Sequence, residues 1–89
     1  MNKLFLILIQ SSVDRDKLIT YLQSQGAISF WFYNMPYSFF VRSHLSSGQL
    51  QNIIIKAQSI KQIIIIHIAK GTDISGFVPD NQVDLFKNL

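Results

Sequence analysis

The sequence predicts an α+β fold, a ferredoxin-like βαββαβ sandwich in which two helices cover one face of a four-stranded antiparallel sheet. Three observations support this prediction. Apolar segments typical of strands alternate with capped helical segments in the order strand, helix, strand, strand, helix, strand. The two middle strands are separated only by a tight turn at residues 34–36. Each strand–helix–strand unit should cross over right-handed, which places the first and third strands in the centre of the sheet.

The first half of the chain supplies a buried strand and a helix. Residues 3–10 form an apolar run without helical periodicity, which predicts a strand. Ser11 and Ser12 are expected to cap the following helix, because Asp14 follows Ser11 at the spacing of a capping box. Gly26 is suited to end that helix, since glycine readily adopts the left-handed conformation found just after many helices.

The second half adds an aromatic hairpin, a second helix and a fourth strand. Residues 27–42 are rich in aromatic side chains and turn at an Asn-Met-Pro sequence, as two antiparallel strands do. Ser46 and Gln49 form a capping box that predicts the start of the second helix. Residues 61–68 are dominated by isoleucine and predict a strand. Residues 70–89 are expected to form a loop and a short C-terminal helix.

Composition limits the domain organisation and the setting of the protein. The 89 residues suffice for a single domain, 1–89, and the apolar content of 48% is ample for a core. The net charge is +3, and only 15% of residues are charged, below the usual proportion of about 25%. The chain has no cysteine and no apolar run of the length, roughly 20 residues, that spans a bilayer. We therefore expect a cytoplasmic protein that does not enter the membrane.

Apolar side chains occupy both faces of the predicted strands, whereas two helices can cover only one face. The other face would be a larger apolar surface than soluble monomers usually expose, so we expect a homodimer. The alternative is that the segment after Gly71 folds across this face. The residues expected at the dimer interface are Phe5, Ile7, Ile9, Trp31 and Tyr33.

The chain offers few residues for catalysis. Asp14 and Asp16 fall in the first helical turn, where carboxylates more often complement the helix dipole than bind metal. His67 lies in the last strand, where a single histidine is usually a packing residue. These three residues are therefore weak catalytic candidates. We expect no metal site and no cofactor, with Mg²⁺ required only if the protein is a nuclease.

Contact with nucleic acid is compatible with the mild positive charge. RNA recognition motifs share this order of elements and stack bases on aromatic residues of the first and third strands. Here Tyr37 replaces the expected glycine, Ser38 an aromatic residue and Phe39 a small one, so core packing accounts better for these aromatics. If nucleic acid is bound, the expected contacts are Arg15, Lys17, Arg42 and Lys70.

The chain resembles the small bacterial proteins labelled SinR-like, and the resemblance covers nearly its whole length. These proteins are similar in turn to the ferredoxin-like CRISPR-associated adaptation protein and to the VapD toxins. The matching segments are the hairpin Trp31-Phe32-Tyr33-Asn34-Met35-Pro36-Tyr37-Ser38-Phe39-Phe40-Val41, the helix start Leu45-Ser46, the strand Gln62-Ile63-Ile64-Ile65-Ile66-His67-Ile68 and the late Gly76-Phe77-Val78-Pro79.

The resemblance implies a homodimer and, in some members, a metal-dependent endoribonuclease or DNase with an aspartate at the end of the first strand. Here that strand ends at Gln10, and no acid precedes Asp14. An amide replaces poorly the carboxylate that magnesium prefers. We therefore predict a non-catalytic dimeric protein that binds RNA, DNA or a partner from a defence or toxin–antitoxin system. The alternatives are a metal-dependent nuclease using Asp14 or Asp16, and a protein-interaction module without affinity for nucleic acid.

Overall fold

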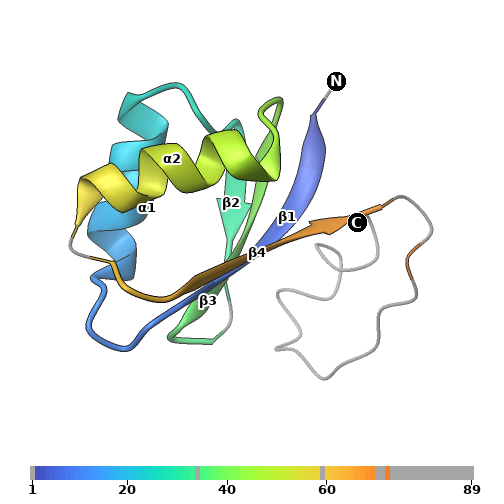
Figure 1. Ribbon diagram of the computed structural model, residues 1–89. Helices are drawn as coiled ribbons and strands as arrows, with labels where there is room; N and C mark the ends of the chain where they lie inside the picture. Colours follow the sequence, from blue (N-terminus) through green and yellow to red (C-terminus); the bar gives the residue numbers. More distant parts are fainter. Residues whose placement is uncertain (1, 34, 59, 70–71, 73–89) are drawn as a thin grey trace.

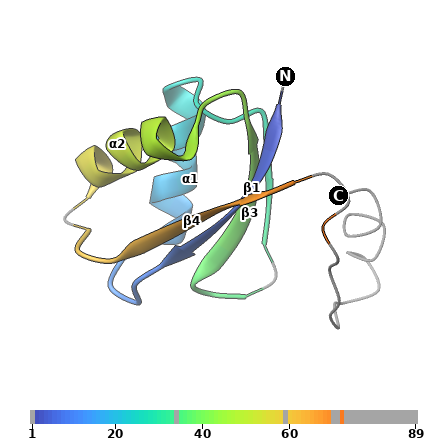
Figure 2. The ribbon, with the colours of Figure 1, turned by 45° about the vertical axis from the view of Figure 1, so that its right-hand side comes forward.

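The computed structural model describes residues 2–33, 35–58, 60–69 and 72, and it shows the predicted α+β arrangement (Figure 1). The strands β1 (Lys3–Ile9), β2 (Phe30–Phe32), β3 (Ser38–Ser43) and β4 (Ile63–Ile68) form one antiparallel sheet. Their order is β2-β3-β1-β4, so the first and third strands are central, as predicted. Both helices lie on the same side of this sheet (Figure 2), an arrangement compatible with a ferredoxin-like fold. The predicted C-terminal helix lies outside the described residues. The helices are α1 (Arg15–Ser24) and α2 (Ser47–Ala57).

The second helix begins where the sequence predicts it. The Ser46 hydroxyl accepts a hydrogen bond from the Gln49 backbone N–H at 3.2 Å. In return, the Gln49 side chain accepts one from the Ser46 backbone N–H at 2.9 Å. This complete capping box satisfies two backbone donors that the first helical turn leaves without an intrahelical partner.

The first helix begins later than predicted, because Asp14 and not Ser11 or Ser12 is its N-cap. The Asp14 carboxylate accepts a hydrogen bond from the Lys17 backbone N–H at 3.1 Å. The two serines lie instead in a turn, which is closed by a hydrogen bond from the Val13 N–H to the Gln10 carbonyl. The helix ends as predicted, since Gly26 follows it with a φ of 65°.

The hydrophobic core lies between the helices and one face of the sheet. Its sheet side comes from Phe5, Ile7 and Ile9 of β1 and from Phe39 and Val41 of β3; its helix side comes from Leu18, Ile19 and Leu22 of α1 and from Leu50 and Ile54 of α2. Burial of each large apolar side chain contributes roughly 1.5–3 kcal/mol, so this layer is the main source of stability.

The helices cover the face that was expected to stay open for a dimer. Phe5, Ile7 and Ile9 are 1%, 0% and 7% exposed, and Trp31 and Tyr33 pack against the same core. The expectation that these five residues form the uncovered face is therefore wrong. Because both faces of β1 are apolar, alternation along the strand does not show which face the helices cover.

The opposite face of the sheet, which we call the helix-free face, is also apolar. On it Phe32 stacks against Phe40, with ring centroids 4.8 Å apart, and Phe30 lies 5.8 Å from Phe32. Leu4, Phe32 and Phe40 form a second buried cluster. In contrast, Phe30, Ile64 and Ile66 are 41%, 57% and 44% exposed. The apolar residues of this face are Leu4, Leu6, Leu8, Phe30, Phe32, Phe40, Ile64, Ile66 and Ile68.

The capping assignment of α1 can be tested through stability. Asp14→Ala should lower the free energy of unfolding by about 0.5–2 kcal/mol, because it removes the cap. Asp14→Asn keeps a capping oxygen and should lose less. Ser11→Ala should change stability by no more than about 0.5 kcal/mol. Urea unfolding followed by circular dichroism measures all three. A larger loss for Ser11→Ala than for Asp14→Ala would contradict the assignment.

Candidate interaction surface

An amide with a structural role occupies the end of β1, where the resemblance would place a catalytic aspartate. The Gln10 Oε1 atom accepts hydrogen bonds from the backbone N–H groups of Lys61 and Gln62, at 2.8 and 2.7 Å. Its Nε2 atom donates to the Ser12 hydroxyl. Gln10 therefore ties the turn after β1 to the loop before β4. The amide accepts from the two N–H groups and donates to Ser12, so both ends of the side chain are used.

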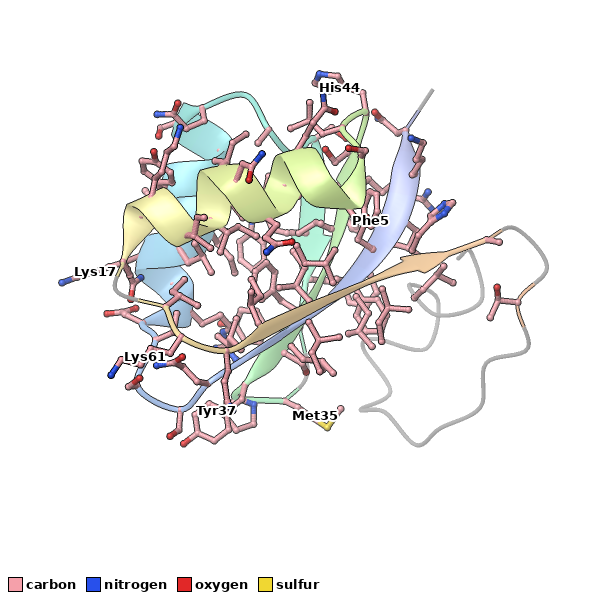
Figure 3. All side chains as sticks on the ribbon, in the orientation of Figure 1. Phe5, Lys17, Met35, Tyr37, His44 and Lys61 are labelled. Carbon is pink, nitrogen blue, oxygen red and sulfur yellow. The ribbon has the colours of Figure 1, made fainter. Side chains whose placement is uncertain are left out.

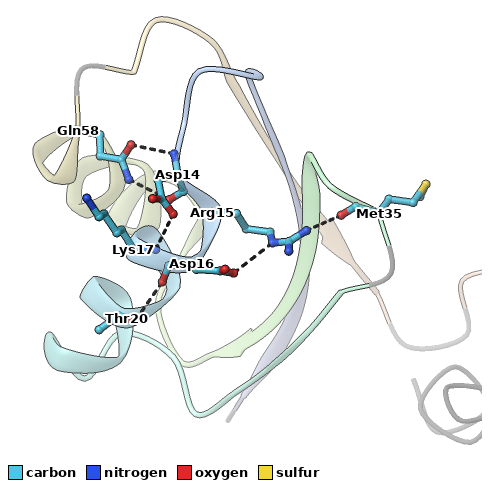
Figure 4. A network of polar contacts seen from close by, with 7 residues as sticks. All are labelled: Asp14, Arg15, Asp16, Lys17, Thr20, Met35 and Gln58. Atoms are coloured by element: carbon cyan, nitrogen blue, oxygen red, sulfur yellow. Dashed lines mark hydrogen bonds and ion pairs between the residues drawn. The ribbon is translucent and has the colours of Figure 1, made fainter.

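The Asp14 carboxylate and backbone are both engaged, and the backbone joins the two helices (Figure 4). The carboxylate caps α1, as described above. The Asp14 N–H donates to Gln58 Oε1 at 3.1 Å, and Gln58 Nε2 donates to the Asp14 carbonyl at 3.0 Å. Gln58 follows the last residue of α2, so this pair of hydrogen bonds joins the start of α1 to the end of α2.

The structure does not bring the three weak catalytic candidates together. Asp16 lies beside Asp14 in the first turn of α1, and its carboxylate is 3.6 Å from Arg15 Nε, with a side chain that is 76% exposed. His67 pairs with Phe5, near the start of β1, and its ring lies 5.3 Å from the Phe5 ring. Within the described ranges, no three His, Cys, Asp or Glu side chains gather as a metal site.

Arg15 anchors α1 to the aromatic hairpin. Its guanidinium carbon lies 3.3 Å from the centre of the Tyr33 ring, and the Tyr33 ring stacks on Trp31 at 5.6 Å. Its Nη1 atom donates to the Met35 carbonyl at 2.8 Å (Figure 4). The side chain is only 16% exposed. Arg15 therefore has a structural role, with a cation–π contact and a hydrogen bond that position the β2–β3 hairpin.

The basic residues expected to contact nucleic acid are divided between the two ends of the sheet. Arg15 and Lys17 lie at the start of α1, near the hairpin, whereas Arg42 pairs with Leu4 and Phe30 at the far end of β3. Lys70 lies outside the described residues.

Two basic residues that the sequence analysis left out, Lys3 and His44, lie close to Arg42. Lys3 pairs with Ser43, which stands between Arg42 and His44 in the chain. We call Lys3, Arg42 and His44 the basic end. Both acids of the described residues, Asp14 and Asp16, lie at the start of α1, away from the basic end. Arg42 and His44 are near neighbours in the sequence, and strand pairing adds Lys3 to them.

The edge strand β4 borders a shallow groove of about 640 Å³. The groove is lined by Gln51 and Ile55 of α2, by Lys61 of the preceding loop, by Ile63 and Ile64, and by the end of β1. Ile55 and Ile64 are 45% and 57% exposed. The α2 flank and the edge of β4 together therefore offer apolar side chains to a partner; Figure 3 shows this flank with all described side chains.

The two helices of the described residues, α1 with 10 residues and α2 with 11, are too short to cross a bilayer. A scan of protein-family models gives no match to this chain, and comparisons with curated proteins and with solved structures also find no similar protein. The resemblance to SinR-like proteins therefore stays a prediction based on sequence patterns.

The structural role of Gln10 predicts a measurable loss of stability. Gln10→Ala leaves two backbone N–H groups without their acceptor and should lower the free energy of unfolding by about 1–3 kcal/mol. The matched control removes another amide side chain, Asn52→Ala, at an exposed position of α2, and should lower stability by no more than about 0.5 kcal/mol. Equal losses for the two changes in urea unfolding would refute the role given to Gln10.

Proposed function

We propose that this protein is a non-catalytic, homodimeric binding protein of the cytoplasm that docks a partner polypeptide on the helix-free face of its sheet. One observation carries this proposal. Each of the four strands places apolar side chains on this face, and those on its two edge strands, Phe30 of β2 and Ile64 and Ile66 of β4, are 41%, 57% and 44% exposed. Burial of such exposed apolar side chains against a partner is favourable by roughly 25 cal/mol per Å².

The chemistry of the helix-free face favours a polypeptide over nucleic acid as its occupant. Base stacking requires aromatic rings with an accessible face. Phe32 and Phe40 are only 6% and 7% exposed and stack on each other, which leaves Phe30 as the exposed aromatic residue of this face. The surrounding positions are leucine and isoleucine, and Arg42 lies at one margin. A surface of this kind suits apolar side chains of another protein.

The contacts of the two acidic residues that the structure describes support the non-catalytic part of the proposal. Asp14 serves as a helix cap, Asp16 pairs with Arg15, and Gln10 occupies the end of β1. Metal-dependent cleavage of RNA or DNA that is abolished by Asp14→Ala or Asp16→Ala would favour the nuclease alternative instead. A role in a defence or toxin–antitoxin system rests on the sequence resemblance alone.

Binding of nucleic acid is a second candidate function, and the basic end is the observation that favours it. Lys3, Arg42 and His44 lie at one end of the sheet, where Lys3 and Arg42 project from opposite faces, and both acids of the described residues lie near the other end. Such a group can neutralise backbone phosphates, and the affinity would then fall steeply with salt as counterions are released. This candidate uses the end of the sheet and leaves the helix-free face for a protein.

Site-specific photo-crosslinking tests the docking face. A photoreactive phenylalanine analogue at Phe30 should give a discrete protein adduct in cells. The same analogue at Tyr37, which is 51% exposed but lies beside the hairpin turn, should not. The adduct should be insensitive to nuclease and sensitive to protease, because its partner is a polypeptide. No adduct at Phe30, or the same adduct at Tyr37, would contradict the proposal.

The second candidate makes a separate prediction about the basic end. Labelled single-stranded RNA and double-stranded DNA, titrated at several salt concentrations, should bind Lys3→Ala more weakly and with a salt slope smaller by about 1. Lys56→Ala, at the far end of α2, is the matched control and should bind like the original protein. Equal behaviour of the two variants, or binding independent of salt, would refute a phosphate site at the basic end.

A further inference from the structure

The edge strand β4 lacks the features that usually protect an exposed sheet edge. Natural edge strands are kept short, bulged, charged or interrupted by proline, because open backbone groups otherwise pair with another chain. Among the described residues β4 pairs only with β1, and this pairing runs without a bulge from Leu4–Ile68 to Ile9–Ile63. The strand contains no lysine, arginine or acidic residue, and neither proline nor glycine. The opposite edge, β2, is protected by its length of three residues.

The side chains of β4 extend this unprotected edge on both faces. Ile64 and Ile66 point to the helix-free face and are 57% and 44% exposed. On the other face, Ile55 of α2 is 45% exposed and borders the groove beside β4. An incoming strand would therefore find backbone groups at the edge, isoleucines on one side, and on the other a groove lined by both apolar and polar side chains. This is the arrangement used in strand addition.

We infer that β4 pairs antiparallel with β4 of a second copy of this chain, which joins two sheets into one across a twofold axis. The inference rests on the proposed function, because it gives the homodimer of that proposal its geometry. A twofold interface requires a self-complementary surface. The strand meets this requirement, since five of its six residues are isoleucine and cross-strand pairs of β-branched side chains are favourable.

The position of the nearest cation favours an antiparallel pair of identical strands. Lys61 stands two residues before β4 and is the charged residue among those described as lining the groove. With the twofold axis near Ile65, the two Lys61 side chains would lie about eight residues, or roughly 26 Å, apart along the pair. That separation exceeds the Debye length of about 8 Å. A parallel pair would instead place these two charges side by side.

Single-cysteine crosslinking tests the inference, because the chain has no cysteine of its own. The positions to scan are Ile64→Cys, Ile65→Cys and Ile66→Cys. A twofold axis at Ile65 or at either neighbouring residue brings one of these residues to within about 5.5 Å of its copy, a Cα separation that a disulfide can span. Mild oxidation should therefore convert most of that variant to a covalent dimer on a non-reducing gel.

Leu6→Cys and Asn52→Cys are the matched controls. Leu6 pairs with Ile66 from the neighbouring strand, so in the proposed dimer it lies three strand spacings, about 14 Å, from its copy. A disulfide cannot bridge that distance, and Leu6→Cys should stay monomeric on the gel. Asn52 is exposed on α2, so the amount of crosslinked Asn52→Cys measures the disulfides that form by random collision of two molecules.

A charge on the edge gives a second measurement. Ile64→Lys should raise the dissociation constant of the dimer at least about tenfold, because a lysine on an edge strand disfavours pairing with another chain and the two new charges would lie on the same face of the joined sheet. Its circular dichroism should be unchanged, since the side chain is already 57% exposed. Asn52→Lys adds the same charge on α2 and should leave the dissociation constant as it is. Analytical ultracentrifugation over a concentration series measures both.

The outcomes separate this inference from the function on which it rests. Crosslinking within β4, together with a weaker dimer for Ile64→Lys, supports the inference. A dimer that crosslinks at Leu6 but nowhere in β4 overturns it and leaves the homodimer standing, with the sheets packed face to face. A chain that stays monomeric at high micromolar concentration overturns both the strand pairing and the homodimer. In that case, photo-crosslinking at Phe30 remains an independent test of whether a partner polypeptide docks on the helix-free face.

Discussion

The contact between the central strand β1 and the two helices determines how the rest of the molecule is arranged. Phe5 and Ile7 are 1% and 0% exposed in this contact, and β1 pairs with β3 on one side and with β4 on the other. A shift of either neighbour by one residue would move its side chains to the opposite face, so burial of this one face holds the register of the sheet. Because the helices bury this face of the sheet, the other face stays free of helices, and β4 lies at the edge of the sheet.

Amides and hydroxyl groups, more than ion pairs, connect the loops of this sparsely charged chain. Gln10 holds the loop before β4, and Gln58 joins the start of α1 to the end of α2. The buried Ser43 hydroxyl donates to the Ala27 carbonyl and accepts from the Leu45 N–H. Neutral partners of this kind are insensitive to salt and pH. One of them, Gln10, occupies the position where the sequence resemblance would place a catalytic aspartate.

The helix-free face and the β4 edge are adjacent, because Ile64 and Ile66 belong to both. Pairing of two β4 strands through a twofold axis perpendicular to the sheet would put both helix-free faces on the same side. A partner polypeptide would then meet one apolar surface of twice the width, flanked by the two basic ends. In this arrangement dimer formation and partner binding would reinforce each other, because a partner that contacts both helix-free faces binds only the dimer.

The sequence by itself determined the order of the elements, the cap of α2 and the glycine that ends α1, because these follow from local periodicity and from the chemistry of caps and turns. It also determined the central place of β1 and β3, which follows from the handedness of the crossovers. Only the tertiary structure decided which face of β1 the helices cover, since Leu4 and Phe5 are equally apolar and alternation alone does not distinguish them. It likewise decided that Gln10 is a structural link and that Lys3 lies near Arg42. Such neighbours are far apart in the chain, and the pairing of strands brings them together.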